Sequence, residues 1–462
     1  MKILVYIFLL SFASSFQFNN ISITPTFYSD YESEGFIWRH KLNQPIAKAG
    51  WGVNYSYEKD NFSVKGRFLN NRFFGITDYP SDFSFQQGLS WWGSDRGEND
   101  FDFDFSDLII CYKLKNSTLS AGKSSFNISE GKRSIIISNK SPSFPFILFG
   151  WDLNKYLSFK YIHGSLKSTV IDENLQSYYN QVGYRRLTTI RNFAYHSLEI
   201  KPNDRFKLFF AELVLYANRT IEPIYLIPLV PFWSAQHYLG DIDNMQIYVS
   251  SSYKFNENSK IYAAVLVDEW SPGDTFDKLN NRNWFSYQLG FNIKNLIENL
   301  SIYFEYNFSD HRVYRHRFSV NDIYSHGFPL GFWAGPHAEE YLLIAQKEIS
   351  KHNLIFSYSV CKRGEITDEM LTYQYNNIYY ERYSGINERY SKTTITFEPY
   401  LQFLKMSFLD NLDLGFHYSH IIYNELNSIE EIFNNKKNSF SITISYDLDK
   451  YYFGNHNTLN KH

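Results

Sequence analysis

The chain has 462 residues, of which 44% are hydrophobic and 19% aromatic, including 38 Tyr and 42 Phe. Its 45 basic and 48 acidic residues leave a formal net charge of −3, so no overall positive field marks it as a nucleic-acid-binding protein. The two cysteines, Cys111 and Cys361, are too few for a disulfide framework and match no zinc spacing. We therefore expect no nucleic acid, metal or other cofactor as a partner.

The first residues have the order of a secretory signal peptide. A positively charged start precedes the apolar run ILVYIFLLSFA, and the small residues Ala13 and Ser15 suit a cleavage site before the next residue. The apolar run is too short to cross a bilayer by itself. No change in composition and no Pro- or Gly-rich linker divides the rest of the chain. We predict a signal peptide at residues 1–15 and a single barrel domain at residues 16–462.

Alternation with a period of two residues recurs along almost the whole chain, with one parity apolar or aromatic and the other polar. It is clearest in residues 47–57, 283–294, 300–308, 412–419 and 440–448. Strands of about ten residues are roughly twice the usual length, and they are long enough to cross a bilayer when tilted. In the second of these segments one face would carry Phe285, Tyr287, Leu289, Phe291 and Ile293, and the other Ser286, Gln288, Gly290 and Asn292.

Short and long connections alternate between these segments. The short ones are residues 58–61, 115–117, 202–204, 256–258 and 295–299, and the long ones are residues 70–104, 123–155, 167–191, 218–243, 310–336 and 364–390. Closure of the sheet removes edges whose unpaired backbone groups are costly in lipid. The sequence therefore predicts an all-β fold, a transmembrane antiparallel up-and-down β-barrel of about 18 strands with short periplasmic turns and long extracellular loops, in a Gram-negative outer membrane.

No motif indicates catalysis. The nucleophile elbow, the Walker loop and the HExxH and CxxC motifs are all absent from the sequence. No acid, base and nucleophile stand out as a set. We therefore expect a protein without enzymatic activity and propose no catalytic residue.

Residues 225–245, YLIPLVPFWSAQHYLGDIDNM, have the composition of a shaped loop between two strand-like runs. The acidic cluster at residues 241–244 resembles the start of a calcium loop, but Gln246 occupies the position where an EF-hand requires glycine. One possibility is a looser cation site that shares Asp268 or Glu269. The other is that the acids form hydrogen bonds within the loop or line the lumen.

Two further loops carry chemistry suited to binding. Residues 79–105 place Trp91 and Trp92 near carboxylates, a combination that stacks on sugar rings and binds their hydroxyls. The same aromatic residues would also pack the loop onto the barrel rim. Residues 310–317, DHRVYRHR, form a small basic patch that suits acidic polysaccharide or lipopolysaccharide phosphates, or a solvated loop face.

Several motifs occur in one order along the chain. They are PLVPF at residues 228–232, then QHY, GD and DN within residues 236–244, then DEW at residues 268–270; weaker ones are GFPLGFWAGPHAEE at 327–340 and IIISNKSPSFPFILF at 135–149, after Gly122-Lys123. In these motifs the chain resembles the capsule-assembly Wzi-like outer-membrane proteins, over residues 122–348. It departs from the family's pattern at ISEG, residues 128–131, which lacks the family's Trp, and in having no helical segment before the first strands.

The resemblance implies a barrel of about eighteen strands that acts as a lectin-like surface protein. We expect a non-enzymatic barrel that binds or retains capsular or extracellular polysaccharide in capsule assembly; the alternative is a general or sugar-selective porin. The difference is whether the lumen is blocked, and residues 218–243 and 310–336 could fold inward as plugs. The expected partners are the polysaccharide, outer-membrane lipid and lipopolysaccharide, with the chain as a monomer. The candidate polysaccharide-binding residues are Trp91, Trp92, Trp233, Gln236, His237, Tyr238, Asp241, Asp243, Asn244, Asp268, Glu269 and Trp270.

Overall fold

The computed structural model describes residues 16–18, 20–33, 45–74, 95–97, 100–175, 187–375, 379–401, 411–427 and 431–446. The expected signal peptide at residues 1–15, together with Trp91 and Trp92, lies outside the described residues. In the described part of the chain, no helix is both long enough and apolar enough to cross a membrane.

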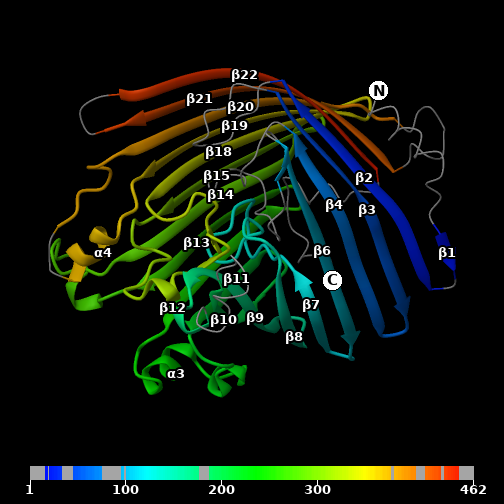
Figure 1. The fold of residues 1–462 in the computed structure, drawn as a ribbon. Helices are drawn as coiled ribbons and strands as arrows, with labels where there is room; N and C mark the ends of the chain where they lie inside the picture. The colour runs from blue at the N-terminus through cyan, green and yellow to red at the C-terminus, as the bar shows by residue number, and fades with distance from the viewer. Residues whose placement is uncertain are drawn as a thin grey trace.

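The strands form one closed antiparallel sheet (Figure 1). It has twenty strands, of which β1 (Phe16–Phe18) and β5 (Asp95–Gly97) are only three residues long. The other eighteen make the barrel wall, and the wall closes where β2 pairs with β22, with Phe27 opposite Tyr446 and Glu32 opposite Ser441. The prediction of an antiparallel barrel of about 18 strands is confirmed.

The wall strands are β2 (Ile21–Glu32), β3 (Ile46–Lys59), β4 (Phe62–Phe74), β6 (Asp100–Lys113), β7 (Ser117–Ser124), β8 (Phe144–Asn154), β9 (Leu157–Ile171), β10 (Thr188–Ile200), β11 (Phe206–Ala217), β12 (Asn244–Asn256), β13 (Ser259–Glu269), β14 (Trp284–Ile297), β15 (Leu300–Ser309), β18 (Ala338–Ile349), β19 (His352–Gly364), β20 (Asn387–Glu398), β21 (Leu412–Leu426) and β22 (Glu431–Tyr446). The loops contain the small hairpin β16 (Tyr324–Ser325) and β17 (Phe328–Pro329), the 3-10 turns η2 (Pro223–Leu226), η3 (Pro272–Asp274) and η4 (Ser319–Asn321), and the helices α3 (Phe232–Tyr238) and α4 (Asp368–Tyr375).

The two faces of the wall differ as the alternation predicts. On β14 the outward side chains Tyr287 and Leu289 are 43% and 48% exposed, whereas inward Gln288 is 1% exposed. Short turns join the strands at one end; between β18 and β19, Ser350 and Lys351 both have positive φ, of 48° and 74°, which is the backbone of a tight hairpin turn. The long connections lie at the other end, which is the outer end of such barrels.

Two segments fill the lumen on the side of β7 to β15. They are residues 125–143, called here the first lumen segment, and residues 310–337, the second lumen segment. Their apolar residues form one buried cluster with inward-facing residues of the wall, such as Phe193 and Leu213. The second lumen segment folds inward, as the sequence analysis allowed for residues 310–336. The first lumen segment was predicted to lie in a long outer loop, and that prediction is wrong.

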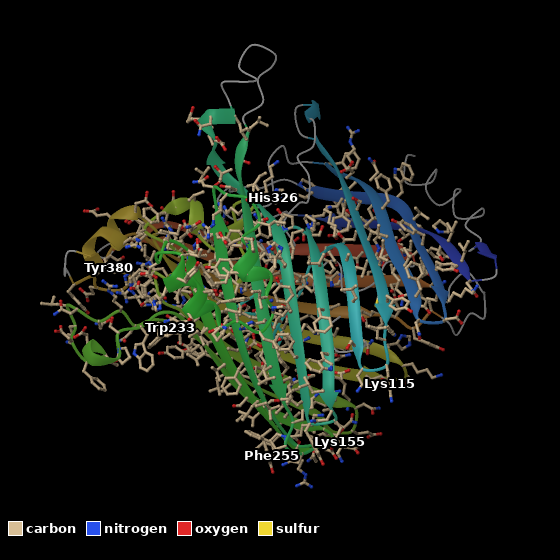
Figure 2. All side chains as sticks on the ribbon, turned by 90° about the horizontal axis from the view of Figure 1, so that it is seen from below. Lys115, Lys155, Trp233, Phe255, His326 and Tyr380 are labelled. Carbon is tan, nitrogen blue, oxygen red and sulfur yellow. The ribbon has the colours of Figure 1, made fainter. Side chains whose placement is uncertain are left out.

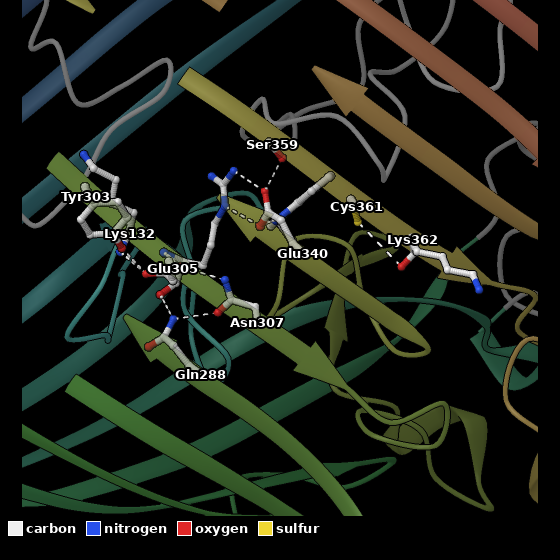
Figure 3. Close-up of polar contacts among 11 residues, drawn as sticks. Lys132, Gln288, Tyr303, Glu305, Asn307, Glu340, Ser359, Cys361 and Lys362 are labelled. Atoms are coloured by element: carbon white, nitrogen blue, oxygen red, sulfur yellow. Dashed lines mark hydrogen bonds and ion pairs between the residues drawn. The ribbon is translucent and has the colours of Figure 1, made fainter. Parts of the chain in front are cut away.

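Buried carboxylates of the wall hold the first lumen segment in place (Figure 3). Glu305 and Glu340 are both 0% exposed. Glu305 accepts the backbone amides of Lys132 (2.8 Å) and Arg133 (3.0 Å), and Glu340 accepts Arg133 Nε (2.9 Å) and Nη2 (2.8 Å). The Trp333 indole of the second segment also donates to Glu340, at 2.7 Å. Each buried negative charge is thus compensated, which keeps the turn fixed inside the barrel.

The two lumen segments also bind one another. The Tyr314 hydroxyl donates to the carbonyl of Ile135 at 2.6 Å and accepts the amide of Phe332 at 2.9 Å. The Ser138 amide donates to the carbonyl of Leu330 at 2.6 Å. The segments therefore behave as one packed plug rather than as two independent loops.

The orientation of β14 generates a prediction about assembly. Phe291 is 36% exposed on the outward face, and Asn292 points inward beside Lys260 and Tyr303. Phe291→Arg should hinder assembly, because an arginine on the lipid face near the bilayer midplane costs ~2–4 kcal/mol. Asn292→Arg should be tolerated as a lumen substitution. Heat-modifiable migration of outer-membrane extracts measures the folded fraction, and equal losses in the two variants would contradict this assignment of faces.

Candidate functional site

Residues 218–243, called here the outer-wall segment, connect β11 to β12 and contain η2 and α3. Figure 1 shows α3 outside the ring of strands, next to β9 to β12. Ile162 and Leu213 face the lumen. The wall residues beneath α3 alternate with such residues along the strands, so they point outward. The segment therefore folds over the outer surface of the barrel and is not a plug. Its buried residues Tyr225, Phe232 and Ala235 pack on Phe159, Tyr161, Ala194, Val214 and Tyr216.

Asp243 is the main brace of the segment. Its carboxylate is buried and accepts both Nη atoms of Arg219, at 2.9 and 2.6 Å, and the Tyr225 hydroxyl at 2.7 Å. Gln236 Nε2 donates to the Asp243 carbonyl (3.1 Å) and to Asp241 Oδ1 (2.7 Å). The two acids thus have partners within the loop. Within the described ranges, no three His, Cys, Asp or Glu side chains come together to hold a metal ion.

Asn244 links the outer-wall segment to the plug. Its side chain donates to the carbonyl of Asn321 at 3.0 Å, and the Asn321 side chain donates to the carbonyl of Ile242 at 2.8 Å. Arg317 Nη2 donates to the carbonyl of Asp241 at 2.7 Å. The outer end of α3 and the second lumen segment therefore form one continuous rim.

Asp268, Glu269 and Trp270 do not join the acidic cluster. Asp268 faces the lumen, where its carboxylate accepts the Gln246 side chain at 2.7 Å and a backbone amide of the second lumen segment. Glu269 lies at an irregularity in the register, where it is opposite Trp284 of β14, and it pairs with Arg282 at 2.5 Å. Trp270 is 52% exposed at the strand end. Asp268 and Glu269 therefore bind separate partners, Gln246 and Arg282, rather than the acids of the outer-wall segment.

The remaining candidates are exposed. The rings of Trp233 and His237 make an edge contact with centroids 4.5 Å apart, and they are one turn apart on α3. Trp233 is 56% and Tyr238 80% exposed. In Figure 2, Trp233 lies away from the short turns that Lys115 and Lys155 mark. We call His237, Tyr238, Asp241 and Arg317 the rim patch, since Arg317 contacts this end of α3.

The expected basic patch at residues 310–317 is mostly neutralised. Its ion pairs are Arg312–Asp310, Arg315–Asp322 and Arg315–Asp368. Burial, together with the charge of Arg317, lowers the pKa of His316 to about 4, so this ring is uncharged at neutral pH. Burial raises the pKa of the Asp322 carboxyl to about 6, although Arg315 opposes the shift. Arg317 therefore supplies the positive charge of this patch at the rim.

Arg219 and Asn321 were not predicted from the sequence as site residues. Arg219 precedes Asp243 by 24 residues and Asn321 follows Asn244 by 77, so no local motif contains either pair. Arg317 was recognised only as part of a basic run.

No family model matches the chain, and no curated protein sequence matches it. Solved structures match its fold. Wzi of Escherichia coli, described as an outer-membrane protein involved in group 1 capsule assembly and as a carbohydrate-binding β-barrel, is 10% identical, with a TM-score of 0.55 over 96% of this chain and 87% of that one. The Occ porin OccAB2 of Acinetobacter baumannii is 12% identical, with a TM-score of 0.51 over 93% of this chain and 98% of that one. At these identities the likeness shows the fold alone, which is that of outer-membrane barrels.

The two neighbouring acids of the segment should respond differently to neutralisation. Asp243→Asn should lower the free energy of detaching the outer-wall segment from the barrel by about 2–3 kcal/mol. The loss is smaller than that expected for a fully buried ion pair, because the Arg219 side chain is 23% exposed. Asp241→Asn should have little effect, since Asp241 is exposed. Limited proteolysis of folded barrels should cut the Asp243 variant faster within residues 218–243, without loss of heat-modifiable migration. Equal cleavage of both variants would show that Asp243 is not the brace.

Proposed function

We propose that this protein is a non-enzymatic outer-membrane barrel that binds or retains capsular or extracellular polysaccharide at its outer rim. The rim patch is the observation that carries the proposal. It presents an exposed tyrosine ring, an imidazole, a carboxylate and a guanidinium on backbone that buried pairs hold in place. Aromatic faces stack on sugar rings and the polar groups bind hydroxyls or acidic substituents. A fixed backbone loses little entropy when the ligand binds.

The candidate residues then divide into two roles. His237, Tyr238 and Asp241 would contact the polysaccharide, together with Arg317. The exposed Trp270 is a further stacking candidate. Trp91 and Trp92, which lie outside the described residues, remain candidates from the sequence alone. The bracing residues, which would act by positioning the rim, are Gln236, Asp243, Asn244, Asp268 and Glu269.

The packed plug supports a surface function, because it occupies the lumen that a transport route would need on that side. The likeness to Wzi, a barrel described as carbohydrate-binding, agrees with this proposal at the level of the fold.

A porin is the second candidate, and the opposite side of the wall favours it. Asp30, Lys48, Arg67, Asp107 and Lys392 all lie on the inward face of β2, β3, β4, β6 and β20, so charges of both signs line this part of the lumen. Charged rings of this kind set selectivity in pores. OccAB2 also shares the fold.

Retention of polysaccharide by intact cells tests the proposal. Tyr238→Ala combined with Arg317→Ala should weaken polysaccharide retention per folded barrel about thirtyfold, because a stacking contact and a charge-assisted hydrogen bond are each worth about 1 kcal/mol. Phe276→Ala is the matched control, since Phe276 is 99% exposed in a neighbouring loop. Folded barrel and bound polysaccharide are measured in the same cells. Normal retention per barrel in the double variant would refute the rim as the binding site.

A further inference from the structure

The wall beneath the outer-wall segment is unusually polar for the outer face of a membrane barrel. On the outward parity of β9, β10 and β11 lie His163, Asn192, His196, Glu212 and Tyr216. The same outward faces carry apolar residues just beyond this area, namely Ile190 and Phe210, which are 62% and 42% exposed. Polar side chains on the lipid face destabilise such barrels in proportion to their depth. This part of the wall therefore needs a cover.

The outer-wall segment covers these groups with its backbone. Both ring nitrogens of His196 face acceptors, the carbonyl of Pro228 at 2.8 Å and the carboxylate of Glu212 at 2.9 Å. Glu212 also accepts the amide of Phe232 at 2.6 Å, and the Phe232 ring stacks on His196 with centroids 4.2 Å apart. The pairing satisfies polar groups of the wall and of the segment at the same time.

The next contacts follow the same pattern. The Tyr161 hydroxyl donates to the carbonyl of Tyr225 at 2.7 Å, and the Tyr216 hydroxyl accepts the amide of Glu222 at 3.2 Å and lies 2.8 Å from His163 Nε2. Proline at positions 223, 228 and 231 removes three backbone N–H donors that would otherwise need partners. Irregular backbone is tolerated at membrane depth only when protein satisfies it in this way.

The other side of the segment is apolar. Residues 223–235, PIYLIPLVPFWSA, contain no charged side chain. Leu226, Ile227, Leu229 and Trp233 are 42%, 51%, 68% and 56% exposed, and they face away from the barrel wall. The neighbouring outward faces also carry exposed apolar residues, Ile190 and Phe210 among them, and exposed polar residues follow at the end of α3, where the rim patch begins.

We infer that the outer-wall segment is embedded in the outer leaflet of the membrane, with Leu226, Ile227, Leu229 and Trp233 in contact with lipid acyl chains. The partner of this surface is the lipid itself, because the surface is uncharged and the neighbouring outward faces of the wall also carry exposed apolar residues. The inference is independent of polysaccharide binding.

Spin-label accessibility tests this placement in phosphatidylcholine vesicles. A nitroxide is attached at Leu229→Cys in a chain whose Cys111 and Cys361 are replaced by serine, with Phe291→Cys as the lipid-facing control and the exposed Lys278→Cys as the aqueous control. The label at position 229 should resemble that at 291, with a ratio of oxygen to nickel-chelate collisions several-fold above that at 278. A ratio like that at 278 would overturn the inference. Low access to both reagents, or label–label broadening that grows with protein concentration, would overturn it in favour of a protein contact.

Quenching by brominated phosphatidylcholine gives a second test that needs no cysteine replacement. The fluorescence that Trp233 contributes is the difference between the wild-type chain and Trp233→Phe. Brominated lipid should quench at least half of this contribution. A contribution that the brominated lipid leaves unchanged would overturn the placement of Trp233.

Discussion

The buried carboxylates of Glu305 and Glu340 are the constraint on which the arrangement of the outer half of this barrel depends. Isolated carboxylates inside the wall would cost several kcal/mol each, and the first lumen segment removes that cost by presenting the Arg133 guanidinium and two backbone amides. The turn so fixed receives the Tyr314 hydroxyl of the second segment. That segment in turn carries Asn321 to the end of α3. The position of the rim therefore follows from charges buried deep in the lumen.

Much of the fold could be predicted because alternation with a period of two residues is a local signal. It placed Phe291 and Asn292 on opposite faces of the sheet correctly, and the strand number near eighteen followed from counting such runs. The path of the first lumen segment could not be predicted in this way. Arg133 is 207 residues from Glu340, and nothing in the local pattern distinguishes a loop that turns inward from one that turns outward.

The candidate site was predicted less well than the fold, for an equally physical reason. Asp243, Asp268 and Glu269 were grouped because their residue types suit ligand binding. In the structure, Asp243 pairs with Arg219, Asp268 accepts a hydrogen bond from Gln246, and Glu269 pairs with Arg282. Neither the Arg219 pairing nor the irregular register at Asp268 and Glu269 is visible in the local sequence pattern. The exposed polar candidates His237, Tyr238 and Asp241 lie together at the end of α3.

The proposed function places the binding surface of the barrel at its outer rim. The plug fills one side of the lumen, the outer-wall segment seals a polar part of the wall, and the rim patch lies where these two structures meet. Single-channel conductance of the purified barrel in planar bilayers tests this account most directly. A barrel that binds polysaccharide at its rim without a transport route predicts no steady open level for the wild-type chain. Arg133→Ala, which frees the turn from Glu340, should then show intermittent openings. A large, steady conductance in the wild-type chain would contradict the account and identify the barrel as a pore.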